Sequence, residues 1–202
     1  MMRRLTKEQF QVSDWSGGRT VQIAIAPPGA LYADRDFLWR VSSATVELDE
    51  SDFTALPDYD RWIMPLAGEM RLSHNGGAPA DLAECEAHAF DGGDATHCWG
   101  RCTDFNLMLR KGRCRGRVFA LRGEAGEERA LDARGALVLY CAEGGATLEA
   151  CGASLTLNAG EAARVEPAEA EGLTLRFTAP GRVAAAEVRE GPDIMAEATQ
   201  AR

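Results

Sequence analysis

Short apolar runs separated by turn residues dominate the chain. Runs of strand length recur, and several alternate polar and apolar residues with a period of two. They cover residues 21–25, 37–46, 62–72, 105–109, 118–121, 137–140 and 173–177. Only residues 51–56 predict a short helical turn, with Ser51 as its cap. Many short strands at this spacing predict an all-β sandwich or barrel.

Glycine-rich turns between the strands show an internal repeat. The order strand, glycine turn, strand runs from residue 63 to residue 108 and recurs, with a shorter middle loop, from 138 to 177. We expect an N-terminal module over residues 1–112, a C-terminal module over 113–189 packed with it as one compact unit, and a frayed tail over 190–202. Glycine-punctuated strands of this kind resemble the cupin barrel. Two such modules predict a bicupin-like, double-stranded β-helix barrel.

Composition and charge exclude several classes of partner. The chain has 202 residues, 46% of them apolar, and its 22 basic and 31 acidic side chains give a net charge of −9. This balance argues against binding to nucleic acid or to anionic membranes, while a local basic pocket for a small anion remains compatible with it. Because no apolar run is long enough to span a bilayer and residues 1–11 lack a signal-peptide pattern, we expect a cytoplasmic protein.

Cysteine and histidine patterns give no support for a metal or other cofactor. The six cysteines contain no C-x-x-C pair and are expected to be reduced thiols rather than a disulfide framework. The three histidines are not paired at ligand spacing, so we expect no metal. His74 precedes an Asn-Gly-Gly turn and is expected to be a turn residue. His88 and His97 are expected to be ordinary surface histidines.

Polar side chains inside apolar strands are the candidate site. Arg40 and Ser42 are two residues apart, so they share one strand face, and Asp104, Asn106 and Met108 share a face in the same way. Such faces either lie in water or line the mouth of a barrel. In the second case, a guanidinium would offer a fork of donors for a carboxylate, and the asparagine would offer both a donor and an acceptor.

Two further segments extend this set. The neighbouring residues Asp60 and Arg61 precede an apolar strand, where they form either an ordinary loop ion pair or an oriented arginine at a barrel rim. Thr20 and Gln22 share a strand face after a glycine pair. That glycine-rich loop leads into a strand instead of a helix, which is the wrong order for a phosphate-binding loop.

Several blocks together resemble the HutD/Ves family. The blocks are Trp15-Ser-Gly-Gly-Arg-Thr20, Trp39-Arg-Val-Ser-Ser-Ala44, Phe53, Pro57-Asp-Tyr-Asp-Arg61, Phe90-Asp-Gly92 and Asp104-Phe-Asn-Leu-Met108. The resemblance is strong from about residue 6 to residue 110 and rests on the strand pattern alone to about 189. It implies a bacterial, bicupin-like β-barrel protein without metal or established catalytic activity, linked to histidine utilisation or stress. The pocket positions it implies are Thr20, Gln22, Arg40, Ser42, Arg61 and Asn106, with Asp104 orienting a neighbouring arginine.

Three hypotheses follow. The leading one is a regulatory or accessory protein that binds a carboxylate metabolite, such as N-formylglutamate or a related histidine-degradation acid, through Arg40 and Asn106. The second is a metal-free isomerase or amide hydrolase with Asp104 or Asp60 as general base and Arg40 as electrostatic stabiliser. The third is an interaction module whose barrel surface pairs two subunits as a homodimer.

Overall fold

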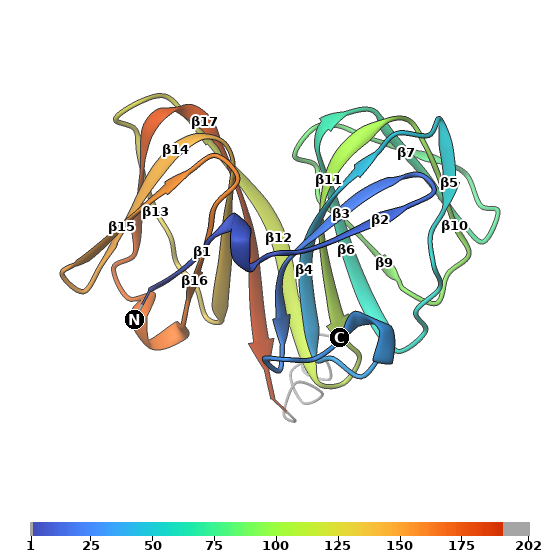
Figure 1. The fold of residues 1–202 in the computed structure, drawn as a ribbon, viewed down its shortest axis with the longest axis horizontal. Helices are drawn as coiled ribbons and strands as arrows, with labels where there is room; N and C mark the ends of the chain where they lie inside the picture. Colours follow the sequence, from blue (N-terminus) through green and yellow to red (C-terminus); the bar gives the residue numbers. More distant parts are fainter. Residues whose placement is uncertain (1, 192–202) are drawn as a thin grey trace, which may run out of the picture. The chain divides into compact units, whose positions relative to one another are not determined.

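The computed structural model describes residues 2–191 and divides the chain into two compact units. Among the described residues, unit 1 comprises residues 2–10 and 119–189, and unit 2 comprises residues 11–118 and 190–191. Figure 1 shows that the described chain is built from strands joined by turns. Of the tail predicted over residues 190–202, residues 192–202 lie outside the described part of the chain, and Glu190 is the last residue of a strand.

Unit 2 consists of two antiparallel sheets. The six-stranded sheet has the order β2 (Gln11–Trp15), β3 (Gly18–Ala26), β4 (Trp39–Val46), β11 (Cys102–Arg110), β6 (Tyr59–Gly68) and β9 (His88–Asp91). The four-stranded sheet has the order β5 (Glu50–Asp52), β10 (Thr96–Trp99), β7 (Met70–His74) and β8 (Ala80–Leu82). A short 3-10 helix, η2 (Tyr32–Asp34), lies between β3 and β4 in the chain.

Unit 1 is built on one larger sheet. Its main path is β1 (Arg3–Leu5), β16 (Ala162–Val165), β14 (Ala136–Ala150), β17 (Thr174–Glu190) and β12 (Cys114–Gly123). Two further strands join it: β13 (Glu128–Ala130) pairs with β17, and β15 (Ala153–Asn158) pairs with β14. The 3-10 helices η1 (Lys7–Gln9) and η3 (Pro167–Glu169) complete it, and the division between the units falls inside β12, after Val118.

The interiors of the two units differ in chemistry. In unit 1, inward-facing side chains of β14 and β17 form one apolar cluster, whose fully buried members include Leu137, Leu148 and Phe177. In unit 2, an apolar cluster that includes Ile63 and Leu72 shares the interior with buried arginine, aspartate and asparagine side chains. Buried polar groups require partners, so unit 2 is the place to look for a functional site.

The all-β prediction is confirmed, but three local predictions are wrong. Residues 51–56 do not form a helical turn, because Ser51 belongs to β5, which pairs with β10. The run 62–72 is two strands, β6 and β7, separated at Gly68, where φ is +83° and a Cβ atom would lie 2.3 Å from a backbone oxygen. The predicted turn at residues 144–145 lies inside β14, as a register irregularity against β17.

The six cysteines are all free thiols, as expected. No helix within residues 2–191 has the length and hydropathy needed to cross a bilayer.

Candidate ligand-binding site

A cavity of about 270 Å³ lies in unit 2. Its wall consists of side chains from β3, β4, β11 and β6, together with η2, the end of β2 and the segment that begins at β5. The structure brings six of the seven predicted residues to this wall: Thr20, Arg40, Ser42, Arg61, Asp104 and Asn106. The seventh, Gln22, is not among the wall residues but contacts one of them. Its Oε1 accepts a hydrogen bond of 2.8 Å from Arg40 Nε.

Arg40 is held by hydrogen bonds from two strands. Besides the bond to Gln22 on β3, its Nη1 donates to Ser42 Oγ on the same face of β4 at 3.2 Å. Its guanidinium carbon lies 4.3 Å from the centre of the Tyr32 ring, in a cation–π arrangement. Burial lowers the pKa of Arg40 to about 10, so the side chain remains cationic at neutral pH.

Arg61 is a deeply buried arginine, with 6% of its surface exposed. Its Nη2 donates to Asn106 Oδ1 at 3.3 Å and its Nη1 to the Thr54 carbonyl at 3.5 Å, and both bonds are long. Its Nε is buried and has no hydrogen-bond partner among the described residues. The guanidinium carbon also lies 5.1 Å from the Phe53 ring centre and 5.0 Å from that of Phe90. Burial lowers the pKa of Arg61 to about 10.

Asp104 fixes the orientation of Asn106. Its Oδ1 accepts a bond of 2.8 Å from Asn106 Nδ2, so the amide oxygen of Asn106 faces Arg61. Only 2% of Asp104 is exposed, and burial is the main cause that raises its pKa to about 6, opposed by the Asn106 bond and the charge of Arg61. The alternation predicted for β11 is what places both side chains on the cavity face.

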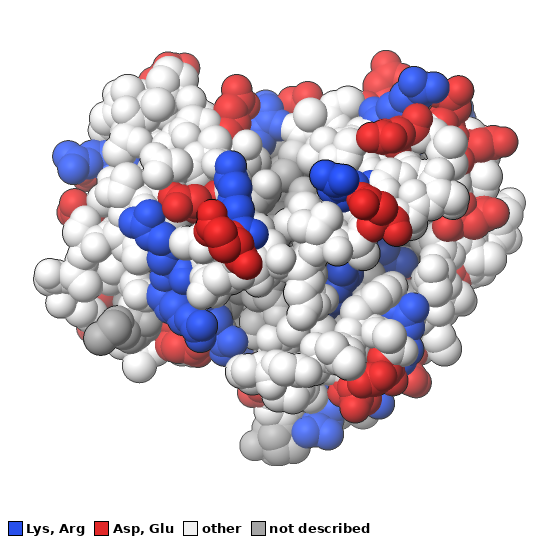
Figure 2. All heavy atoms as spheres, in the orientation of Figure 1, with Lys and Arg blue, Asp and Glu red and all other residues white. Residues whose placement is uncertain are grey.

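The two arginines of the cavity wall have no described carboxylate within ion-pair distance. The wall also carries Asp104, whose charge acts on both arginines from further away, and Asp52, which contacts His97. The chain as a whole is acidic, and on the face drawn in Figure 2 acidic and basic side chains are interspersed. A buried guanidinium without a carboxylate at ion-pair distance is unfavourable, so this arrangement is suited to receive an anion.

The aromatic side chains of the wall are the part that sequence reasoning missed. Trp15 and Phe53 lie in the blocks that resemble the HutD/Ves family, but nothing in the sequence assigned them to a pocket. Tyr32 had no sequence signal, because a local sequence does not show which loop folds over a sheet. Asp60, the alternative candidate base, is absent from the cavity wall, since it neighbours Arg61 on β6 and therefore points to the other face.

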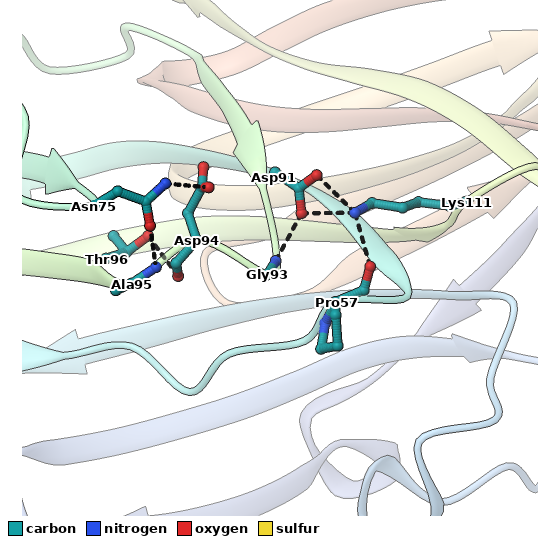
Figure 3. A network of polar contacts seen from close by, with 8 residues as sticks. All are labelled: Pro57, Asn75, Asp91, Gly93, Asp94, Ala95, Thr96 and Lys111. Atoms are coloured by element: carbon teal, nitrogen blue, oxygen red, sulfur yellow. Dashed lines mark hydrogen bonds and ion pairs between the residues drawn. The ribbon is translucent and has the colours of Figure 1, made fainter.

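A polar network anchors the segment that follows Phe53 and Thr54. Lys111 Nζ lies 2.6 and 2.7 Å from the two carboxylate oxygens of Asp91 and donates to the Pro57 carbonyl at 2.7 Å (Figure 3). The network therefore ties the segment at Pro57 to the end of β9. Immediately before this segment, the Thr54 carbonyl and the Phe53 ring contact Arg61.

Gly17 allows the Trp15 ring to lie at the cavity. A Cβ atom at Gly17 would lie 2.1 Å from the ring, so we expect Gly17→Ala to displace Trp15 and to shift the tryptophan fluorescence emission. Ligand affinity should fall by no more than about tenfold, the size of one lost apolar contact. The exposed neighbour Ser16, changed to alanine, is the control. An unchanged emission spectrum in Gly17→Ala would contradict this role.

Two of the three histidines, His74 and His88, differ from their expected environments. His74 is not a turn residue but the last residue of β7, and its Nε2 lies 2.9 Å from His88 Nε2. His97 contacts Asp52, with 2.7 Å between Nδ1 and Oδ1. Within residues 2–191, no group of three or more His, Cys, Asp or Glu side chains is placed to hold a metal ion. The cavity offers guanidinium, hydroxyl and amide groups and one buried carboxylate, a donor set that does not fit a transition metal.

Comparison with known proteins gives a consistent result. A family model described as HutD matches residues 7–185. The protein Ves of Cronobacter sakazakii is 34% identical over 118 residues, which are 55% of this chain and 62% of that protein. The chain thus matches less than two thirds of the length of this curated relative.

Solved structures are similar over nearly the whole chain. A conserved protein of unknown function from Pseudomonas aeruginosa PAO1 is 29% identical, with a TM-score of 0.79 over 94% of this chain and 100% of that one. HutD from Pseudomonas fluorescens SBW25, in a structure described as the formate condition, is 20% identical, with a TM-score of 0.71 over 95% and 100%. The second similarity shows the fold alone, and that fold is a cupin-like β-barrel.

Proposed function

Because the chain belongs to the HutD family, we propose that it is an accessory cupin-like protein whose cavity binds a small carboxylate metabolite. The observation that carries this proposal is Arg61. It is almost fully buried, its Nε has no hydrogen-bond partner among the described residues, and its other bonds are long. A carboxylate in the cavity would add a negative charge beside this guanidinium and give it a stronger acceptor than these long bonds provide.

The polar groups around the arginines suit a ligand with both charge and hydrogen-bonding groups. Asn106, Ser42 and Thr20 line the same cavity, and the volume of about 270 Å³ suits a small metabolite. Family membership favours an acid of histidine degradation, such as N-formylglutamate or a relative, and a regulatory role in histidine utilisation or stress. We further propose that the two units are related modules in a bicupin-like arrangement and that the protein acts in the cytoplasm.

Calorimetric titration tests the ligand class. We expect at least one of formate, glutamate, N-formylglutamate and urocanate to bind, and we expect Arg40→Ala to weaken that binding about tenfold or more, because it removes a charged donor. The exposed Arg101, which pairs with Asp49, provides the matched control Arg101→Ala, whose affinity should equal that of the original protein. Unchanged affinity in Arg40→Ala would remove Arg40 from the site.

The second candidate function is a metal-free enzyme with Asp104 as general base. The raised pKa of Asp104, about 6, favours it, because a base of this kind is poised near neutral pH. A screen of the same acids and their amides for turnover distinguishes the two functions. Binding without turnover supports the accessory role.

A further inference from the structure

The His74 and His88 rings form a hydrogen-bonded pair beside the cavity arginine. Their planes are 7° from parallel and their centres are 5.2 Å apart, whereas their Nε2 atoms are separated by only 2.9 Å. For nearly parallel rings, this combination requires the two nitrogens to point at each other, edge to edge. A metal ion midway between the two nitrogens would lie closer to each of them than about 2.0 Å, the length of a metal–imidazole bond. The contact is therefore a hydrogen bond.

Thr96 extends this hydrogen bond to the backbone. Its Oγ1 lies 2.8 Å from His74 Nδ1 and 3.4 Å from the Asp94 carbonyl, within the network drawn in Figure 3. Each neutral ring has one N–H and one lone pair, so one of the two Nε2 atoms donates and the other accepts. The chain of bonds runs from His88 through His74 and Thr96 to the backbone.

This pair accepts one extra proton readily and a second with difficulty. One added proton makes one ring cationic, and its Nε2–H then donates to the Nε2 of the neutral ring, which strengthens the bond between them. A second added proton would remove the acceptor and place two N–H groups against each other. The two rings therefore share one added proton.

Phe90 brings the pair close to Arg61. The His74 and Phe90 ring centres are 4.8 Å apart, and the Arg61 guanidinium carbon is 5.0 Å from the Phe90 centre, so charge on the pair and on Arg61 interact through a largely apolar layer. Burial, His88 and Arg61 lower the pKa of His74, and Asp94 on the β9–β10 turn raises it. Of the neighbouring thiols, that of Cys98 stays protonated, with a pKa of about 12.

We propose that the His74–His88 pair is a proton-binding regulator of the cavity: a proton on the pair and an anion on Arg61 favour each other. This inference rests on the proposed function, because the anion is the ligand of the same cavity. With Arg61 unpaired, its charge opposes a cationic pair. With Arg61 neutralised by a carboxylate, that repulsion is removed, so binding takes up a proton and becomes tighter as the pH falls below neutral.

Histidine NMR of the ligand-free protein tests the charge coupling. In Arg61→Met, the titration midpoint of the pair should rise by about half to one pH unit, the size expected for one removed charge at this separation. His97, whose partner is Asp52, serves as the internal control and should not shift. A midpoint of the pair that stays within error in Arg61→Met would overturn the proposal.

Calorimetry with formate at pH 6.5, in buffers of different ionisation enthalpy, tests the linkage. The variant His74→Gln/His88→Gln should take up fewer protons on binding than the original protein. Asp104→Asn removes the buried carboxylate of the cavity wall and should retain the uptake due to the pair. Full uptake in the double variant would overturn the linkage. If formate and the other acids do not bind the original protein at all, the proposed function fails, whatever the NMR midpoints show.

Discussion

Replacing Arg61 by methionine is expected to weaken anion binding strongly and, at the same time, to stabilise the ligand-free protein. The affinity should fall about 100-fold or more, because truncating a buried charged partner costs about 2–5 kcal/mol. The stability should rise by about 1–3 kcal/mol, because the free protein holds this cation with no carboxylate at ion-pair distance, and a buried charge is often replaced by an apolar side chain at a gain. The attraction between Arg61 and Asp104 that the variant loses is the opposing contribution. Methionine also suits the Phe53 and Phe90 rings that contact Arg61.

Two measurements on one variant decide this prediction. Calorimetric titration gives the affinity, and urea denaturation of the ligand-free protein gives the free energy of unfolding. Arg101→Met removes an exposed arginine and should change neither quantity measurably. Loss of stability in Arg61→Met, with binding retained, would mean that the Arg61 side chain is a structural support and not the ligand's partner.

Asp104→Asn is expected to stabilise the protein in a pH-dependent manner. The folded protein raises the pKa of Asp104 to about 6, above its value near 4 in an unfolded chain, chiefly through burial. The folded state therefore binds this proton more tightly, and stability is lost as the pH rises from about 4 to about 6. The loss amounts to about 2–3 kcal/mol at pH 8, since Asp104 is almost fully buried. Asparagine resembles the protonated acid and escapes this loss.

Urea denaturation of both proteins at pH 5, 6, 7 and 8 measures the difference. The variant's advantage should grow between pH 5 and 7 and then level off. The amide oxygen that Asp104→Asn introduces can still accept the bond that Asn106 donates to Asp104, so the cavity wall should be preserved. A constant difference at all four values would show that Asp104 does not titrate in this range.

The strand pattern predicted which polar side chains share a face of their strand. It did not predict that these faces meet around one cavity. The two-residue spacing of Arg40 and Ser42, and of Asp104 and Asn106, follows from the geometry of a strand and needs no tertiary information. Their joint position on the wall is what the structure adds. Tyr32 and the His74–His88 pair could not be predicted, because each depends on a loop or strand brought in from a distant part of the chain.

Local sequence signals for a turn or a helical turn failed where a strand from elsewhere in the chain offers pairing. The pair at residues 144–145 has the composition of a turn, yet long-range pairing with β17 carries β14 through it. Residues 51–56 likewise became strand and loop because β10 offered a pairing partner. In both places tertiary hydrogen bonding outweighed local preference.

The different interiors of the two units have an evolutionary consequence. The apolar cluster of unit 1 depends on volume and shape, so mutations that conserve them can drift there without altering ligand recognition. Under the proposed function, the polar cavity wall of unit 2 would concentrate specificity in a few side chains of residues 11–118. Divergence among homologues toward new ligands would then be recorded in the sequence of unit 2, while the apolar cluster of unit 1 would record the demands of packing.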